Sequence, residues 1–218
     1  MSKPRVIFLD AVGTLFGVKG SVGQVYSDFA KRFGVVAAVN DVDRAFYKSF
    51  KTAPAMAFPT APKTDVPHLE YLWWKKVAQQ TFARLELLPK FTDFETFFTE
   101  VYQHFATADP WLLYPDTMSS IARWQRQDIE LGIISNFDSR LHSVLTALDL
   151  IGKFQSVTIS TEVGVAKPDS LIFITALQKH QAAATEAWHI GDSYDEDFLG
   201  AQSAGLKGIW IKRQGLYA

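Results

Sequence analysis

Four short polar segments of this chain each follow a run of apolar, strand-like residues, and this order constrains the fold more than any other feature. Beyond residue 109 such runs alternate with helical patterns, which is typical of βα units and a parallel sheet. Ligands in open α/β sheets bind outside the carboxyl ends of the strands, so we expect the four segments to meet in one crevice. The segments are Asp10-Ala11-Val12-Gly13-Thr14, Ser135-Asn136, Lys167-Pro168, and Gly191-Asp192-Ser193 followed by Asp197.

Residues 5–10 are continuously apolar up to Asp10, as expected for a strand buried on both faces of a parallel sheet. The later pattern predicts four more strands and four helices. The strands are expected at residues 129–134, 157–159, 187–190 and 208–211. The helices are expected after Asp116, at residues 141–148 and 170–180, and in a segment that ends before Gly205.

The region between the first strand and residue 109 has a helical pattern instead. Apolar residues recur at helical spacing in segments 21–34 and 67–85, in one that Asn40 is expected to cap, and in one that Thr92 is expected to cap. Residues 52–67 are rich in proline and predict a loop. We therefore predict an α/β fold with a doubly wound, parallel-sheet, Rossmann-like core at residues 1–16 and 109–218. An all-helical domain is expected to be inserted at residues 17–108.

Composition excludes several classes of function. The chain has 218 residues, no cysteine, and 22 basic against 23 acidic residues with no long run of one sign. Thiolate chemistry is thereby excluded, and nucleic acid is not an expected partner. Without a signal-peptide pattern or an apolar run of membrane-spanning length, we expect a cytoplasmic protein that does not contact membranes.

The residue types in the four segments suit phosphoryl transfer. Asp10 is the candidate nucleophile, because a carboxylate can form an aspartyl-phosphate and divide hydrolysis into two displacements. Its charge would repel a phosphate, so a cation is needed, and Mg²⁺ prefers oxygen ligands. We expect Mg²⁺ to be held by Asp10, Asp192 and the backbone carbonyl of Val12.

Three other groups would contact the phosphate in this interpretation. Ser135 offers a hydroxyl, and the turn at Asn136 offers backbone N–H groups at a helix start, where anions are favoured. Lys167 supplies a point charge for the phosphate and the nucleophile. A small phosphorylated molecule is therefore the expected substrate.

These segments, in this order, resemble the motifs of the haloacid dehalogenase-like (HAD) hydrolase superfamily, with a helical cap of the C1 type inserted after the first strand. The first motif of that family, Asp-x-Asp-x-Thr, is matched by Asp10 and Thr14, and the fourth by Gly191-Asp192 with Asp197. Ser135 and Lys167 match the second and third. The resemblance implies that Thr14 supports the turn, and that Asp197 holds metal-bound water or orients Lys167.

Val12 departs from the pattern of the family's phosphatases, which have at this position the aspartate that acts as general acid and base. The departure leaves three hypotheses: a phosphatase that is slow or limited to good leaving groups, one whose cap supplies another acid, or a protein that is not a phosphatase. The main alternative is metal-independent 2-haloacid dehalogenation, which tolerates a non-acid there. Against it, Asp192 and Asp197 would repel a carboxylate substrate. A non-catalytic protein that binds a phosphoryl ligand or a partner is a further alternative.

Other residues near the motifs are expected to have structural roles. Asp195 and Glu196 are interpreted as a solvated first helical turn without a catalytic role, and His189 as a structural residue. The aromatic residues of the helical region are expected to form its core, with one of Trp73 and Trp74 exposed at the mouth of the crevice. Substrate identity and oligomeric state do not follow from the sequence.

Overall fold

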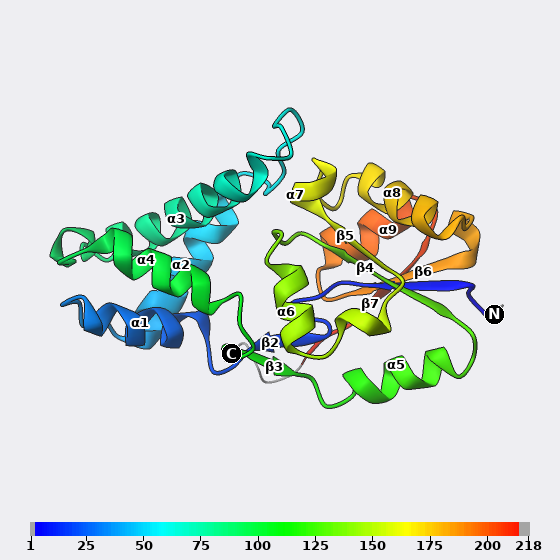
Figure 1. Ribbon diagram of the computed structural model, residues 1–218, viewed down its shortest axis with the longest axis horizontal. Helices are drawn as coiled ribbons and strands as arrows, with labels where there is room; N and C mark the ends of the chain where they lie inside the picture. The colour runs from blue at the N-terminus through cyan, green and yellow to red at the C-terminus, as the bar shows by residue number, and fades with distance from the viewer. Residues whose placement is uncertain (1–2, 214–218) are drawn as a thin grey trace.

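The computed structural model describes residues 3–213 and contains, within them, a five-stranded parallel sheet (Figure 1). Its strand order is β5-β4-β1-β6-β7, so the first strand of the chain lies at the centre. Val6 is opposite both Glu130 on β4 and Ala187 on β6. The strands are β1 (Val6–Leu9), β4 (Glu130–Ser135), β5 (Ser156–Ile159), β6 (Ala187–Gly191) and β7 (Lys207–Trp210).

All four residues of β1 are buried, as the unbroken apolar run predicts. Alternate side chains of a strand point to opposite faces, so both faces of β1 need a cover. Ile7 and Leu9 belong to one apolar cluster, whereas Val6 and Phe8 belong to another. Helices α5 and α6 pack on the first face, and α8 and α9 on the second (Figure 1). These helices are α5 (Thr117–Gln125), α6 (Leu141–Ala147), α8 (Ser170–His180) and α9 (Gly200–Ser203). The α/β fold with a parallel sheet is thus confirmed.

The four α-helices between β2 and β3 lie together beside the sheet (Figure 1). Their mutual contacts are dominated by aromatic rings, with Tyr26, Phe82 and Phe97 buried at the centre. This group of helices, residues 22–104, is called the helical segment below. Its members are α1 (Val22–Arg32), α2 (Val39–Thr52), α3 (Val66–Arg84) and α4 (Phe94–His104).

A two-stranded antiparallel ribbon connects the helical segment to the sheet. Strand β2 (Phe16–Val18) pairs with β3 (Trp111–Leu113), so the chain leaves for the helical segment and returns from it at adjacent points. The sequence does not predict this ribbon, because three-residue strands carry no recognisable period. The remaining short elements are η1 (Leu88–Lys90), η2 (Ile151–Lys153), α7 (Ser160–Val163), η3 (Ala184–Glu186) and η4 (Tyr194–Leu199).

Two predicted details at helix starts were wrong. Helix α2 begins at Val39, so Asn40 lies inside it rather than capping it. Helix α4 is capped by Asp93, whose carboxylate accepts from the Thr96 N–H at 3.0 Å, while the Thr92 hydroxyl donates to the Phe33 carbonyl. The helix expected before Gly205 is present: it begins as the π-helical turn η4 and continues directly into α9, which ends at Ser203.

Side chains of the helical segment also bond directly to the sheet part. Glu70 on α3 is fully buried, and its carboxylate accepts from the Ser139 N–H at 2.9 Å and from the hydroxyls of Ser139 and Thr161. Trp74 donates from its indole nitrogen to Asp138 at 2.6 Å. These bonds hold α3 against the loop that follows β4 and against helix α7, which follows β5.

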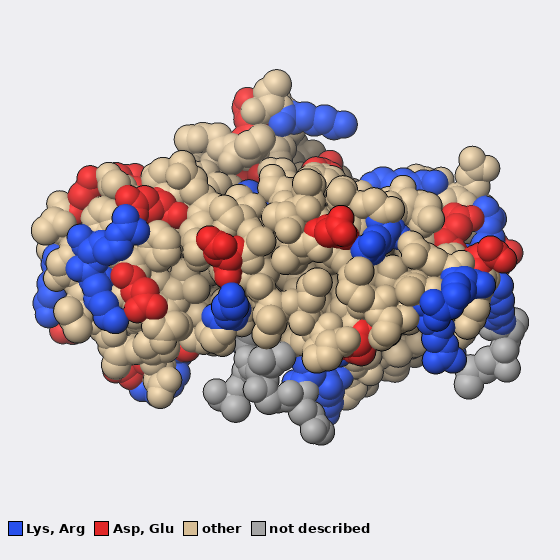
Figure 2. Space-filling model, turned by 60° about the horizontal axis from the view of Figure 1, so that its bottom comes forward, with Lys and Arg blue, Asp and Glu red and all other residues tan. Residues whose placement is uncertain are grey.

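The surface in Figure 2 carries basic and acidic side chains along its whole length, rather than a stripe of one sign. In residues 3–213, no helix combines the length and the apolar character that crossing a bilayer would require.

Candidate functional site

The four polar segments meet at the carboxyl edge of the sheet. Asp10 follows β1 directly, Ser135 is the last residue of β4, and Asp192 follows the last residue of β6. Because β4, β1 and β6 are neighbours in the sheet, their ends lie side by side. The loop after α7 adds Lys167, whose ammonium reaches Asp10. The sequence-based prediction of convergence at this edge therefore matches the observed geometry.

Lys167 is buried and forms the centre of the site's polar network. Its ammonium donates to Asp10 Oδ1 at 2.7 Å, to Asp197 Oδ1 at 2.6 Å and to the Ile134 carbonyl at 3.0 Å. Burial by itself lowers the pKa of Lys167, but the carboxylates of Asp10 and Asp197 outweigh burial and hold this pKa above its usual value. Lys167 is therefore a fixed positive charge beside the candidate nucleophile.

Asp197 is bonded at both of its carboxylate oxygens. Oδ1 accepts from Lys167 and from His189 Nε2 at 2.7 Å, and Oδ2 accepts from the Ser193 N–H at 3.0 Å. Burial opposes ionisation of this group, yet Lys167 and His189 hold the pKa of Asp197 well below its usual range. The arrangement suits a carboxylate that orients Lys167, and it gives His189 the structural role that the sequence suggested.

The negative charges of Asp10 and Asp192 are balanced less completely by neighbouring groups than the charge of Asp197 is. Burial raises the pKa of Asp10 to about 7, against the opposing charge of Lys167, and the neighbouring carboxylates add to this rise. Loss of hydration also raises the pKa of Asp192 to about 6, and the charge of Asp197 adds to it. The second oxygen of Asp10 has no hydrogen-bond partner within residues 3–213.

The same carboxylates form a cluster with the composition of a cation site. One oxygen each from Asp10, Asp192 and Asp197 lie within 4.8 Å of one another. Mg²⁺ is bound through hard oxygen ligands, usually one or two carboxylates together with water and substrate phosphate. Asp10 and Asp192 fit this requirement, because they bring excess negative charge to one place and each has a raised pKa.

Two glycines permit the close approach of these groups. A Cβ atom at Gly13 would lie 2.3 Å from Asp192 Oδ2, and the φ of Gly13 is +90°, which side chains rarely tolerate. A Cβ atom at Gly191 would lie 2.1 Å from the carboxyl carbon of Asp197. Any side chain at either position would push a carboxylate out of the cluster.

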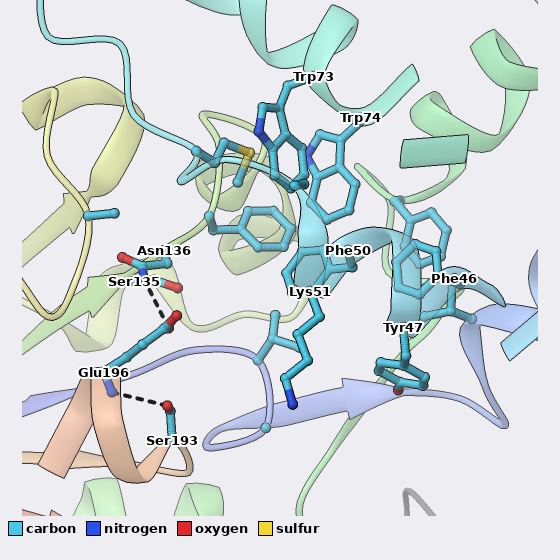
Figure 3. A pocket seen from close by; sticks show the side chains of 18 of the residues that line it. Phe46, Tyr47, Phe50, Lys51, Trp73, Trp74, Ser135, Asn136, Ser193 and Glu196 are labelled. Atoms are coloured by element: carbon cyan, nitrogen blue, oxygen red, sulfur yellow. Dashed lines mark hydrogen bonds between the residues drawn. The ribbon is translucent and has the colours of Figure 1, made fainter. Parts of the chain in front are cut away.

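Asn136 connects two segments of the site through its side chain, not only through the backbone N–H groups that the sequence suggested. Its Oδ1 accepts from the Lys167 N–H at 2.7 Å, and its Nδ2 donates to the Lys167 carbonyl at 2.9 Å. Ser135 lies beside it and lines the cavity described below (Figure 3). The hydroxyl of Thr14 is buried but has no hydrogen-bond partner in the described part of the chain. The turn is held instead by backbone bonds, such as that from the Thr14 N–H to the Ala11 carbonyl at 3.3 Å.

A cavity of about 980 Å³ extends from these carboxylates to the helical segment. Val12 lines it, so the position where the family's phosphatases have their second aspartate does face the cavity. Trp73 and Trp74 both line it, and both are partly buried, whereas we expected one of them to be exposed at the mouth (Figure 3).

Sequence reasoning missed Glu196, which it interpreted as part of a solvated helical turn. Glu196 lines the cavity and accepts from Asn136 Nδ2 at 3.0 Å (Figure 3). Loss of hydration raises its pKa, although Lys167 opposes this shift. Its position directly before Asp197 is the signal that could have identified it, because both residues lie in the turn that follows Asp192.

Comparison with known proteins gives one consistent result. A family model described as haloacid dehalogenase-like hydrolase matches residues 4–205. The haloacid dehalogenase-like hydrolase domain-containing protein 3 of Mus musculus is 31% identical over 207 residues, which are 95% of this chain and 81% of that protein.

Solved structures share the fold at lower identity. The L-2-haloacid dehalogenase of Xanthobacter autotrophicus superimposes with a TM-score of 0.67 at 18% identity, covering 93% of this chain and 75% of that one. A HAD phosphatase from Thermococcus onnurineus has a TM-score of 0.64 at 21% identity, covering 97% and 87%. With the family model spanning nearly the whole sequence, this chain belongs to the haloacid dehalogenase-like hydrolase family.

Proposed function

We propose that the protein hydrolyses small phosphate monoesters with the help of Mg²⁺, through an aspartyl-phosphate on Asp10. The observation that carries this proposal is the pairing of two undercompensated carboxylates, Asp10 and Asp192, with the fixed ammonium of Lys167. A metal-independent attack by Asp10 would require neither the second carboxylate nor the close packing of Gly13 against it. Mg²⁺ bound by Asp10, Asp192 and the Val12 carbonyl would neutralise charge on the phosphoryl oxygens.

The chain's own residues would carry out the reaction in two steps. The unbonded oxygen of Asp10 attacks phosphorus, and the bond from phosphorus to the ester oxygen breaks with its electron pair on that oxygen. The Ser135 hydroxyl donates to a phosphoryl oxygen. The positive charge of Lys167, whose three N–H groups are already bonded to the protein, stabilises the phosphoryl group electrostatically. Water then attacks phosphorus, and the bond from phosphorus to Asp10 breaks with its electron pair on the carboxylate, which restores Asp10 and releases inorganic phosphate. The attacking water loses a proton to solvent, and the departed ester oxygen takes one from solvent. Asn136, Asp197 and His189 act by holding Lys167 in place.

The helical segment would act as the cap in this proposal. The ribbon of β2 and β3 provides two crossing points between it and the sheet, close to the domain limits at residues 17 and 108. Bonds from Glu70 and Trp74 hold the segment over the cavity. Substrate selection is therefore assigned to side chains of α2 and α3, which line the cavity.

The reaction class can be tested with two substrates. Hydrolysis of 4-nitrophenyl phosphate that requires Mg²⁺ and is abolished by a chelator would support the phosphatase, with Asp10→Asn as the inactive control. Release of chloride from 2-chloropropionate in the presence of a chelator would instead identify a dehalogenase, the candidate that Val12 favours. A protein with neither activity at any metal concentration would be a binding protein, and the proposal would be wrong.

Restoring a carboxylate at position 12 should increase turnover of alkyl phosphates. Val12 lines the cavity, so the side chain of Val12→Asp would face it and could protonate the departing oxygen. We expect kcat for an alkyl phosphate to rise by about 100-fold, at the lower end of the usual range of general acid–base help. The gain on 4-nitrophenyl phosphate should be smaller, because its leaving group needs no proton. Val12→Asn has a similar shape without a transferable proton, and an equal gain in that variant would contradict the explanation.

Binding of Mg²⁺ should stabilise the protein more at pH 8 than at pH 5.5. With raised pKa values of about 7 and about 6, Asp10 and Asp192 hold protons in the folded, metal-free state at pH 5.5, and Mg²⁺ must displace them. Without metal, these raised values favour the folded state at low pH, and this contribution is lost as the pH rises from about 4 to 7. At pH 8 both groups are ionised, and saturating Mg²⁺ should raise Tm by about 5 °C or more.

Differential scanning fluorimetry with and without Mg²⁺ measures this difference. Asp192→Asn should remove most of the shift, whereas Asp195→Asn, an exposed acid on the same turn, should retain it. Equal shifts at the two pH values, or a full shift in Asp192→Asn, would show that Mg²⁺ binds elsewhere.

A further inference from the structure

The wall of the cavity opposite the carboxylates is built from aromatic rings whose faces are not fully packed. Phe50 and Tyr47, one turn apart on α2, are 41% and 44% exposed, and both line the cavity. Trp73 and Trp74 on α3 line it beside Phe50 (Figure 3). The other phenylalanine, tyrosine and tryptophan rings of the helical segment are buried or partly buried, so Phe50 and Tyr47 stand out as aromatic surface left open next to a polar site.

Three of these rings, Phe50, Trp73 and Trp74, are held in fixed orientations, and they are called the aromatic wall below. Trp73 donates from its indole nitrogen to the Pro54 carbonyl at 3.0 Å, and Trp74 donates to Asp138. Phe50 stacks on Trp74 with 18° between their planes, and meets Trp73 edge-on at 86°. A wall ordered before binding loses little entropy when a flat ligand docks on it.

Val12, at the other end of the cavity, limits which ester oxygens can leave. Without an acid at position 12, the ester oxygen departs carrying its negative charge. A phenol, like the tyrosine side chain, has a pKa of about 10, whereas that of water is about 15.7, so an aryl oxygen leaves far more easily than an alkyl oxygen. Aryl phosphates are thus the monoesters that least require the group that this chain lacks.

Lys51 adds a positive charge to the same space. It lies near the end of α2, next to Phe50, and its ammonium extends into the cavity (Figure 3). Within residues 3–213 it forms no ion pair or hydrogen bond. The other two cations that line the cavity, Lys167 and Arg140, are each paired with aspartates. Lys51 is therefore available to attract a departing phenolate.

We infer that the substrate is the phosphate monoester of a phenol, with its aryl group against the aromatic wall and its phosphate at Asp10. The inference rests on the proposed phosphatase function and specifies its substrate class. When the bond from phosphorus to the aryl oxygen breaks, the electron pair stays on that oxygen, and the phenolate takes its proton from water. The wall thus selects the leaving group that the site can release without an acid.

Two esters with similar leaving-group acidity separate aryl recognition from leaving-group chemistry. We would compare kcat/KM for 1-naphthyl phosphate with that for hexafluoroisopropyl phosphate, whose fluorinated alcohol has an acidity close to that of a phenol. Stacking of a base on an aromatic side chain contributes about 1–3 kcal/mol, so we expect the wild type to favour the naphthyl ester by about tenfold or more. Phe50→Ala should lower this ratio about tenfold, and Phe50→Leu, which keeps apolar bulk without the ring, should lower it less.

The control is Leu72→Ala, which removes an exposed apolar side chain of α3 that does not line the cavity. Its ratio should stay within about twofold of the wild type. Equal rates on the two esters in the wild type, or a ratio unchanged in Phe50→Ala, would overturn the aryl inference while leaving the phosphatase proposal intact.

If neither ester reacts, calorimetry with 1-naphthylphosphonate tests the aryl site separately. In this compound a P–C bond replaces the P–O–aryl linkage, so it cannot be hydrolysed as an ester. If the wild type binds 1-naphthylphosphonate saturably and Phe50→Ala binds it about tenfold more weakly, the aryl-binding site is supported and the phosphatase proposal is rejected. No binding, or equal binding by the two proteins, would reject the aryl site as well.

Discussion

Replacing Asp10 by asparagine is expected to lower Mg²⁺-dependent hydrolysis of an aryl phosphate by at least ~10⁴-fold, because an amide cannot serve as the nucleophile. The protein should remain folded, since the amide keeps the shape of the carboxyl group and can still accept a hydrogen bond from Lys167. Steady-state kinetics on 4-nitrophenyl phosphate measures the loss. Mass spectrometry of acid-quenched wild type should detect phosphate on the peptide that contains Asp10, and the variant should lack it.

Asp195→Asn is the matched control for this substitution. Asp195 is exposed, and it follows Asp192 closely in sequence without lining the cavity. The control should keep its activity within about twofold of the wild type. Substantial turnover by Asp10→Asn would remove Asp10 from the role of nucleophile, and phosphate on another residue would identify the group that replaces it.

Replacing Lys167 by methionine is expected to reduce both activity and stability. The ammonium is buried between Asp10 and Asp197, so its removal leaves two buried carboxylates without their counter-charge. Breaking a buried ion pair from one side typically costs about 3–5 kcal/mol of unfolding free energy. Loss of the positive charge beside the phosphoryl oxygens should also lower kcat by about 10²–10³-fold. Urea unfolding in the presence of a chelator, together with steady-state kinetics, measures the two effects.

The stability loss of Lys167→Met should depend on pH. Lys167 helps to hold the pKa of Asp197 below its usual range. In the wild type, the ionised Asp197 therefore stabilises the folded state fully at pH values above the ordinary pKa of an aspartate. This contribution is lost only as the pH falls from that value toward the lowered pKa. The variant lacks this contribution, and its carboxylates can accept protons at a higher pH than in the wild type. The destabilisation should therefore be large at pH 7 and smaller at pH 4.5.

A second substitution tests the electrostatic explanation directly. Adding Asp197→Asn to Lys167→Met removes one of the two uncompensated charges, and it should recover part of the lost stability at pH 7. If the double variant is less stable than Lys167→Met by the full effect of Asp197→Asn alone, the two side chains do not interact, and the ion-pair explanation is wrong.

Local sequence patterns determined the central architecture. The unbroken apolar run at residues 6–9 specifies a strand that is buried on both faces, and such a strand belongs at the centre of a parallel sheet. Helical periods placed α1 to α4 between the first strand and the rest of the sheet. Because the polar segments follow strand ends, their convergence on one edge was also predictable. Asp10, Ser135, Lys167 and Asp192 are accordingly found together.

Tertiary structure alone decided how these groups are paired. The hydrogen bonds of the site join residues from separate loops and strands. Asp197 bonds to Lys167 and His189, and the Asn136 side chain bonds to the Lys167 backbone. No periodicity encodes such pairs, because they depend on the relative placement of elements far apart in the chain. The short β2–β3 ribbon and the buried contact of Glu70 with Ser139 escaped prediction for the same reason.

The aromatic residues show this division most clearly. Helical spacing correctly indicates that the rings of the helical segment share a face, since period 3.6 reports which side of a helix is apolar. It does not report whether that side meets another helix or an open space. Phe82 and Phe97 are buried in the core, whereas Phe50 and Trp73 line the cavity, and only the packing of the helices in three dimensions separates these two groups.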